Sequence, residues 1–408
     1  MAENLGPRDA AEVEQAIQWA IADGKTLEIV GRGSKRRIGR AAQWDMTLDL
    51  SRLSGVTLYE PAELVLSAKA GTPLAEIETL LAANGQELAF EPMDYGPLLG
   101  GTAGGASIGG VLSSNLSGPR RIKAGAARDH FLGVTAVSGR GETFKSGGRV
   151  VKNVTGYDLC KLLAGSWGTL AAMTDVTVKT LPRAETEQTA LVFGLDDAAA
   201  GKLMTAVMGS FADASAAAHV SASLAERLAE TAAVGKAVTG FRLEGVAPSV
   251  AHRRAVLEDL AKPYGTVAAL EQAHSRAFWR AIRDATPFAA GGPSGARDIW
   301  RISTAPARGS EAGRALIERA GAEVLYDWAG GLVWAALPPT DDAKAGPVRA
   351  IVGGIGGHAT LIRAPAAVRA AVDVFQPEPP VLAALTRRVR ESFDPRGVLN
   401  SGRMWAGI

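Results

Sequence analysis

The chain has 408 residues, of which 47% are hydrophobic and 21% charged, proportions typical of a globular protein of two or three domains. Its 44 Lys and Arg residues nearly balance its 42 Asp and Glu residues, which argues against binding nucleic acid by neutralising phosphates. The first residues do not read as a secretory signal, and no run of about 18 apolar residues predicts a membrane span. The single cysteine, Cys160, excludes an internal disulfide and fits a reducing compartment; we interpret it as a small buried side chain.

The sequence of the first half predicts helices and strands separated by glycine-containing loops. Apolar residues at helical spacing, helix stop signals and alternating apolar residues indicate these elements. In order, they are a helix at 9–23, a strand at 27–30, a strand at 63–70, a helix from 72 to 85 with Pro73 at its first position, a hairpin of 132–137 and 142–144, a helix at 159–164 and a strand at 169–180.

Three glycine-containing loops in this half suggest a site for an anionic ligand. They are 31–34, the long run at 96–118, and 165–170. Glycine lets the backbone approach a ligand closely, and successive N–H groups can cradle an anion. A linker would be polar, whereas the long run carries apolar residues. Together the loops suggest a long ligand with phosphates in its middle, such as a dinucleotide, with the basic residues of 35–40 beside the first loop.

The common nucleotide-binding motifs do not fit this sequence. No GxxxxGK[ST] segment is present. The Gly31-Arg32-Gly33 segment fails the Rossmann fingerprint because Arg36 stands where the third glycine belongs. Residues 354–359 spell GxGxxA, but they follow a predicted helix rather than a strand, so we interpret the match as chance.

The second half of the chain has an element order that can be read twice as βαββαβ. This order is typical of ferredoxin-like units, so we expect a duplication with an antiparallel sheet and helices on one face. The first unit comprises strand 189–194, helix 197–211, strands near 218 and at 238–245, helix 249–262 and a strand near 267. The second comprises strand 298–304, helix 310–320, strands 323–328 and 332–337, a helix near 343–352 and strand 359–363. A last helix at 379–392 leads into FDPRGVLNSGRMW, whose apolar residues need a surface to pack against.

Four segments taken in order resemble a known family. They are VGRGS, SIGGVLSSNLSGPRRIKAGAARD, KNVTGYDLCKLLAGSWGTLAAMTDVTVKTLP and FDPRGVLNSGRMW. They are similar to FAD-binding proteins of the vanillyl-alcohol oxidase and p-cresol methylhydroxylase (PCMH) type. The GPRR and KNVTGYDL segments are most similar to the FAD-binding (E) subunits of bacterial glycolate oxidases. The resemblance implies an α+β fold with a two-part PCMH-type FAD-binding domain at 1–183, an α+β cap domain at 184–372, and a C-terminal segment at 373–408 that returns to the FAD domain.

The resemblance also implies which residues hold FAD. By their places in the motifs these are Gly31, Arg32, Gly33, Ser34, Ser107, Ile108, Gly109, Gly110, Ser113, Ser114, Gly118, Gly165, Gly168, Thr169 and Asn400. Covalent members of the family carry a His in or beside the first loop, where this chain has Gly33-Ser34-Lys35, and the glycine run lacks a Cys tether. We therefore expect noncovalent FAD.

The sequence offers candidates to line a flavin face but none for a metal site. Related 2-hydroxyacid dehydrogenases carry a metal on a closely spaced His pair, a spacing that the five histidines of this chain do not show, so we expect no metal. Arg301, His358 and Arg363 are the best candidates to line a flavin face, since an Arg can clamp a carboxylate. For the two arginines, an ion pair at a surface or domain interface is at least as good an interpretation.

The resemblance implies a component of an FAD-dependent oxidoreductase. It would be a glycolate oxidase subunit that works with a catalytic flavoprotein subunit and an iron–sulfur subunit, moving electrons from a 2-hydroxyacid towards quinone. The chain has no four-cysteine cluster site, so an iron–sulfur centre belongs to a partner. Two alternatives stay open: a free-standing FAD oxidase or dehydrogenase of small alcohols or hydroxyacids, and a scaffold with structural FAD. We expect a cytoplasmic protein, held at the inner face of the membrane only through its partners.

Overall fold

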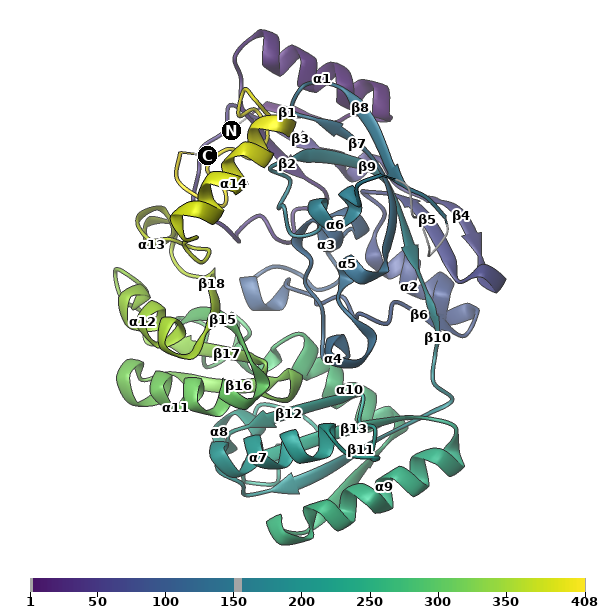
Figure 1. The fold of residues 1–408 in the computed structure, drawn as a ribbon, viewed down its shortest axis with the longest axis vertical. Coiled ribbons are helices and arrows are strands. Elements are labelled where there is room, and N and C mark those ends of the chain that lie inside the picture. The colour runs from purple at the N-terminus through teal and green to yellow at the C-terminus, as the bar shows by residue number, and fades with distance from the viewer. Residues whose placement is uncertain (1–2, 150–155, 408) are drawn as a thin grey trace.

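The computed structural model describes residues 3–149 and 156–407. Of the KNVTGYDL segment, residues 152–155 thus lie outside the described residues. The described chain contains a three-stranded, a five-stranded and an eight-stranded sheet and a two-stranded ribbon. In Figure 1 the first half of the chain, in purple and teal, lies above the green second half, and the yellow C-terminal helix lies back against the first half.

The N-terminal sheet is parallel and is covered by one helix. Its strands lie in the order β1 (Glu3–Leu5), β3 (Met46–Asp49), β2 (Leu27–Val30). Helix α1 (Ala10–Ala22) begins after Asp9, whose carboxylate accepts a hydrogen bond from the Glu12 N–H group at 2.9 Å. This cap satisfies one of the free N–H groups at the helix start. The buried side chains of α1 share a core with residues of all three strands.

The five-stranded sheet is antiparallel and has the order β4-β5-β9-β7-β8. Its strands are β4 (Val56–Glu60), β5 (Val65–Lys69), β9 (Ala171–Lys179), β7 (Phe131–Ser138) and β8 (Thr143–Gly147). The helices of this half are α2 (Leu74–Ala83), α3 (Ile108–Ser114), α4 (Arg121–Ala124), α5 (Ala127–His130) and α6 (Leu159–Leu163), and β6 (Gln86–Glu87) and β10 (Leu181–Pro182) form the ribbon. Pro73 precedes α2 as its cap instead of occupying its first position.

Part of the long glycine run is a helix rather than a loop, contrary to our expectation. Helix α3 begins after Ser107, whose hydroxyl accepts a hydrogen bond from the Gly110 N–H group at 3.4 Å. A Cβ on Gly109 would lie 2.8 Å from both the Cβ and the carbonyl oxygen of Ala70. The glycine therefore lets the helix pack directly against the turn after β5.

The eight-stranded sheet confirms the expected duplication. Its elements run β11 (Thr186–Phe193), α7 (Asp197–Met208), β12 (Ala216–Val220), β13 (Val238–Gly245), α9 (Ala247–Ala261), β14 (Val267–Glu271), then β15 (Asp298–Thr304), α11 (Gly309–Ala320), β16 (Glu323–Asp327), β17 (Leu332–Leu337), α12 (Ala345–Ile355) and β18 (Gly357–Arg363). The order β14-β11-β13-β12-β16-β17-β15-β18 is entirely antiparallel. Each unit is ferredoxin-like, and the units join through their second strands, β12 and β16.

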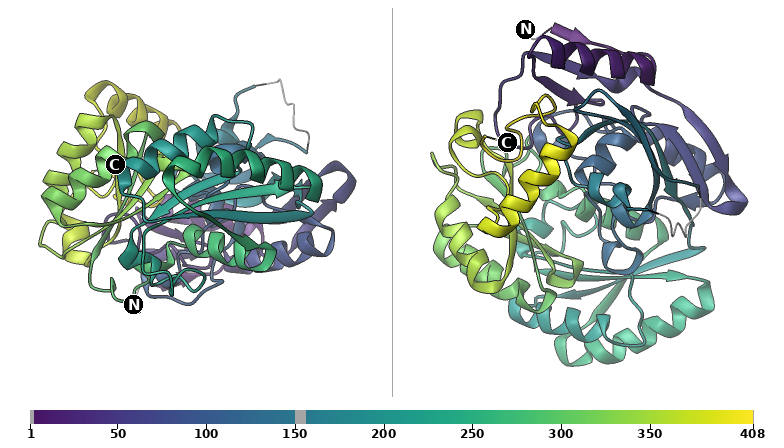
Figure 2. Two further views of the ribbon diagram at one scale, coloured as in Figure 1. Left: turned by 90° about the horizontal axis from the view of Figure 1, so that it is seen from below. Right: turned by 45° about the horizontal axis from the view of Figure 1, so that its top comes forward.

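The helices of the two units form one layer. Contacts link α7 with α9, α7 with α11, and α11 with α12 on one face of the sheet, and Figure 2 shows this sheet with its helices from two further directions. Helix α10 (Gln272–Arg283) was not predicted; its buried Phe278 packs close to Gly240 of β13. The short helix α8 (Ala222–Ala225) follows β12.

The last part of the chain returns to strand β2 of the N-terminal sheet. After α13 (Ala366–Ala371) and α14 (Pro380–Phe393), the Leu27 N–H group donates to the Val398 carbonyl at 2.8 Å and the Asn400 N–H group donates to the Leu27 carbonyl at 2.9 Å. The Asn400 side chain accepts from the Ile29 N–H group and donates to the Trp167 carbonyl. These bonds hold the apolar FDPRGVLN tail against the first half of the chain. The exact division of the chain at 183 and 372 stays a prediction.

A buried ionic network joins the two halves of the chain. Glu91 receives two hydrogen bonds from Arg242 of β13, at 2.7 and 2.9 Å, and one from the Arg120 N–H group at 2.7 Å. Burial would raise the pKa of Glu91, but Arg242 and Arg120 outweigh it and lower the pKa to about 2. Arg120 also pairs with Glu244 at 3.1 Å. Removing one member would leave buried charge without a partner.

This network predicts a defined loss of stability in acid. The folded pKa of Glu91 is below its ordinary value of 4.5, so its ionised form stabilises the fold above pH 4.5, and this contribution is lost as the pH falls to about 2. We expect Glu91→Gln to lower the free energy of unfolding by about 3 kcal/mol at pH 7 and to flatten the pH dependence in that window. Urea denaturation at several pH values measures both effects. Glu311→Gln, at an exposed pair, is the control; an equal loss there would contradict the prediction.

Candidate functional site

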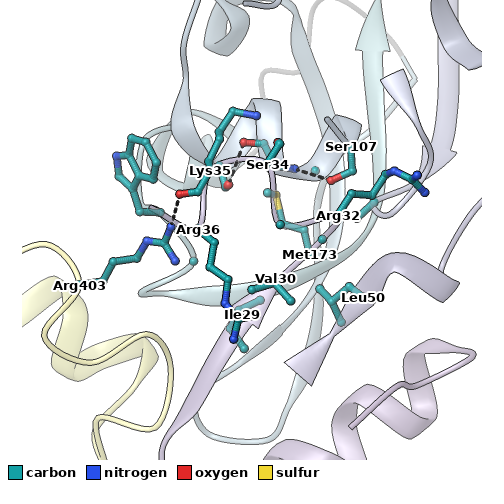
Figure 3. A pocket seen from close by; sticks show the side chains of 18 of the residues that line it. Ile29, Val30, Arg32, Ser34, Lys35, Arg36, Leu50, Ser107, Met173 and Arg403 are labelled. Atoms are coloured by element: carbon teal, nitrogen blue, oxygen red, sulfur yellow. Dashed lines mark hydrogen bonds between the residues drawn. The ribbon is translucent and has the colours of Figure 1, made fainter. Parts of the chain in front are cut away.

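A cavity opens beside the loop that follows β2, with about 680 Å³ of space when the open region at its mouth is included (Figure 3). It combines the first glycine-containing loop, the start of α3 and the turn before β9. The residues that line it are Ile29, Val30, Gly31, Arg32, Gly33, Ser34, Lys35, Arg36, Leu50, Ala70, Ser107, Gly109, Gly110, Ser113, Trp167, Gly168, Ala171, Met173 and Arg403. The structure thus brings together parts of all three predicted loops.

The first loop offers a row of free backbone donors to this cavity. The N–H groups of residues 32–35 donate to no acceptor within the described part of the chain, and Gly33 has a φ of +75°. Successive N–H groups of this kind form a concave site for an anion. A Cβ on Gly31 would lie 2.3 Å from the Ser107 hydroxyl, so the loop and the start of α3 are in close contact. These features fit a diphosphate group.

The glycine run contributes less of its backbone than we expected. The Ile108 N–H group donates to the Thr72 carbonyl and the Gly109 N–H group to the Ala70 carbonyl. Both donors are therefore used inside the protein. Gly110, whose N–H group has only the long bond to Ser107, combines a weakly used donor with a place in the cavity wall.

Two buried cations lie at the same cavity. Burial lowers the pKa of Lys35 to about 8, against an opposing effect of Asp94. Burial likewise lowers the pKa of Arg403 to about 10, and its guanidinium donates to the Lys35 carbonyl at 2.9 Å. Buried charges are costly unless paired, so an anion bound here would relieve both groups.

A second cavity, of about 850 Å³, meets the first at Trp167, which lines both. It lies between the first half of the chain and strands β15 and β18. Its lining comprises Ser114, Asn115, Leu116, Arg121, Gly165, Trp167, Arg301, Ser303, Trp328, His358, Thr360, Ile362, Phe375 and Met404. Of the catalytic candidates, Arg301 and His358 are here. His358 is exposed at the cavity surface, and partial loss of solvent together with the nearby arginines lowers its pKa.

Arg363 lies outside both linings because it is fully engaged elsewhere. Its guanidinium donates to the carbonyls of Leu98 and Phe288 at 2.7 Å and to the Ser294 carbonyl. This pattern holds a loop and a strand together. Arg363 thus binds backbone carbonyls, and among the described residues it has no partner for the ion pair that the sequence left open as an alternative.

Four predicted cofactor residues line neither cavity. The Gly118 N–H group donates to the Phe90 carbonyl, and the Gly118 carbonyl accepts from the Trp328 indole. Ile108 is fully buried beneath the start of α3. The Thr169 hydroxyl donates to the Ser166 carbonyl. Asn400 holds β2 to Trp167, and a Cβ on Gly168 would come within 2.7 Å of its amide nitrogen.

Sequence reasoning missed several lining residues. Lys35 was recognised only as part of a basic cluster, and Arg403 only as part of a motif. Trp328 and Arg121, which meet in the second cavity with the guanidinium carbon of Arg121 4.4 Å from the indole centroid, had no signal that joined them. Pairs this distant in the chain are visible only once the fold is known.

Two further features bear on the predicted function. In the described ranges, no helix is long and apolar enough to cross a membrane. Across residues 3–149 and 156–407, no three His, Cys, Asp or Glu side chains gather into a metal-binding group, and the expectation of no metal stays a prediction. Cys160 is buried, as expected, and burial raises its pKa to about 12.

Comparisons with known proteins agree with this geometry. A family model described as an FAD binding domain matches residues 5–147. Glycolate oxidase subunit GlcE of Escherichia coli is 31% identical over 97% of this chain and 97% of its own. An uncharacterized FAD-linked oxidoreductase of Mycobacterium tuberculosis is 28% identical over 97% and 89%. The structure of p-cresol methylhydroxylase with substrate bound superposes with a TM-score of 0.72 over 98% of this chain and 88% of that chain, at 13% identity.

These likenesses confirm the resemblance in the sequence and the expected fold class. They also identify FAD as the cofactor, which the free N–H groups and buried cations of the first cavity fit. Because GlcE of Escherichia coli matches end to end at over 30% identity, the chain is an FAD-binding oxidoreductase component that belongs to the GlcE family.

Proposed function

We propose that this chain is the FAD-carrying subunit of a glycolate oxidase complex. The observation that carries the proposal is the end-to-end likeness to a protein named as a glycolate oxidase subunit. In the proposed complex, a catalytic flavoprotein subunit and an iron–sulfur subunit are its partners, and electrons pass from a 2-hydroxyacid through them towards quinone. The complex would lie at the inner face of the membrane through those partners.

In this proposal the residues of the first cavity hold FAD without a covalent bond. The free N–H groups of residues 32–35 and the charges of Lys35 and Arg403 would bind the diphosphate. No described residue in the cavity lining is a His or Cys that could form a tether. Bound FAD supplies a carrier that accepts and releases electrons. In this proposal the protein positions the cofactor and offsets its charge, and Trp167 forms one wall of the cofactor cavity.

Turnover by the separated and assembled proteins tests the proposed function. We expect the purified chain to bind FAD but to oxidise glycolate with an artificial acceptor far more slowly than the complex with both partners. A rate near that of the complex would contradict the subunit role and favour a free-standing oxidase or dehydrogenase. Full activity of a complex whose chain cannot bind FAD would instead favour a scaffold with structural FAD.

A substitution at Gly110 tests the cofactor cavity without disturbing the packing of α3. A Cβ on Gly110 would meet only the Ser107 hydroxyl, at 3.2 Å, whereas one on Gly109 would collide with Ala70. We expect Gly110→Val to lose most bound FAD, because its methyl groups occupy the cavity, while the FAD-free chain unfolds at an unchanged temperature. Gly353→Val, at a helical glycine with open space around it, is the control. Unchanged flavin absorbance in Gly110→Val would place the cofactor elsewhere.

The lowered pKa of Lys35 predicts how FAD affinity depends on pH. Below its pKa of about 8 the ammonium is charged and can bind a diphosphate, so the dissociation constant should be flat near pH 6–7 and rise above about pH 8. Lys35→Arg should remove this rise, and Lys35→Met should weaken binding roughly tenfold at pH 7. Fluorescence titration of the FAD-free chain at several pH values measures the constants. A rise that persists in Lys35→Met would assign the titration to another group.

A further inference from the structure

The second cavity contains two arginine side chains that no described residue binds through a hydrogen bond or ion pair, although the buried carboxylate of Asp327 is near enough to favour the charged form of Arg301. Arg301 is 9% exposed, and no hydrogen bond or ion pair joins its guanidinium to another residue in the described part of the chain. The same holds for Arg121, which is more exposed and lies opposite on the cavity wall of the first half. Their guanidinium carbons lie 5.0 and 4.4 Å from the centroid of the Trp328 ring.

Arg349 of the same molecule has a similar aromatic contact and shows what Arg301 lacks. Arg349 also lies 5.0 Å over a tryptophan, Trp300, but its guanidinium donates to the Phe375 carbonyl at 2.8 Å and to the Gln376 side chain at 2.6 Å. The terminal nitrogens of Arg349 therefore bond to the protein, as expected of a structural residue. Arg301 has the aromatic contact without the acceptors, and stacking on a ring offsets only part of the cost of burying a charge.

The sheet register places neutral polar groups beside Arg301. Side chains two residues apart on a strand share a face, so Arg301 and Ser303 of β15 are on one face with His358 and Thr360 of β18. Arg301 pairs with Thr360, and Ser303 with His358. All four line the cavity. The intervening Trp300 and Ile302 are fully buried. Polar side chains thus gather where the sheet faces the first half of the chain.

We propose that the second cavity binds the carboxylate of a small 2-hydroxy or 2-oxo acid, with Arg301 as its anchor. A carboxylate matches the two parallel N–H groups of a guanidinium, and Arg121 adds positive charge from the opposite wall. Ser303, Thr360 and neutral His358 supply donors and acceptors for the neighbouring hydroxyl or oxo group. The proposal rests on the proposed function only for the choice of glycolate-like acids among carboxylates.

The position of this cavity gives the proposal its significance. Trp167 separates it from the cofactor cavity and lines both, so an acid held by Arg301 would lie next to the space assigned to FAD. The subunit would then contact substrate or product itself, in addition to any hydroxyacid site on a partner. The paired N–H groups of Arg301, rather than a close-fitting wall, would select a carboxylate over other anions.

Direct binding to the full FAD-loaded chain tests the site without requiring turnover. We expect calorimetric titration to detect glycolate and oxalate, with binding weakened roughly 10- to 100-fold in Arg301→Met, as is usual when charge-assisted hydrogen bonds are lost. Arg301→Lys should retain the charge and lose the paired N–H groups, and so give an intermediate affinity. Arg314→Gln, which removes an exposed arginine of α11, should bind the acids like the parent.

A stability measurement separates a ligand anchor from a structural residue. Because Arg301 makes no polar bond with any described residue, the FAD-loaded Arg301→Met variant should keep its flavin and melt no lower than the parent. A lower melting temperature or lost flavin would overturn the proposal in favour of a structural or flavin-holding role. A glycolate affinity of Arg301→Met within threefold of the parent's would also overturn the proposal. So would inorganic phosphate binding to the parent as tightly as glycolate does.

These outcomes are distinct from failure of the proposed function. If the parent binds FAD and supports the complex but binds no small acid, only the carboxylate site is wrong. If the parent cannot bind FAD, the proposed function itself is wrong, whatever the acids do.

Discussion

The hydrogen bonds between residues 398–400 and strand β2 are the constraint on which the candidate site depends. Strand β2 pairs with β3 on one side and with this returning segment on the other, so the loop that follows it leaves a fixed edge with free N–H groups. Through its side chain, Asn400 also holds Trp167, a residue with a φ of +55°, a conformation that persists only where its surroundings enforce it. Since Trp167 lines both cavities, one asparagine near the C-terminus positions the cofactor loop and the wall between the two spaces.

The charges of this protein fall into two groups that differ in what satisfies them. In the network around Glu91, every carboxylate and guanidinium has a partner within the protein, and the network links β13 to the first half. At the cavities, Lys35, Arg403 and Arg301 are buried, and no carboxylate of residues 3–149 or 156–407 forms an ion pair with them. A folded chain retains such groups at a cost in stability. Binding of anions at the cavities, as proposed above, would offset that cost.

Much of the fold could be predicted from the sequence because local residue patterns indicate most of its helices and strands. Strands β13, β15 and β17 have the predicted bounds, and the repeated βαββαβ order revealed the duplication before any pairing was known. Strand β1 has only three residues, too few to show a period, and it was missed, as were β3 and β4. The junction of β12 with β16 could not be foreseen either, since no local signal says which edges of two similar units will meet.

The candidate site was predicted less well, for a physical reason that the glycines illustrate. A glycine is required wherever a Cβ would collide, and the sequence does not say with what. Gly109 avoids Ala70 and Gly168 avoids Asn400, so both serve protein contacts although they border the cavity. Lys35 and Arg403 acquire their importance from burial, which composition cannot show. Arg301 shows the same limit. Its strand could be predicted, but only the fold shows that no described residue bonds to its guanidinium, whereas Arg349 and Arg363 donate to carbonyls of the protein.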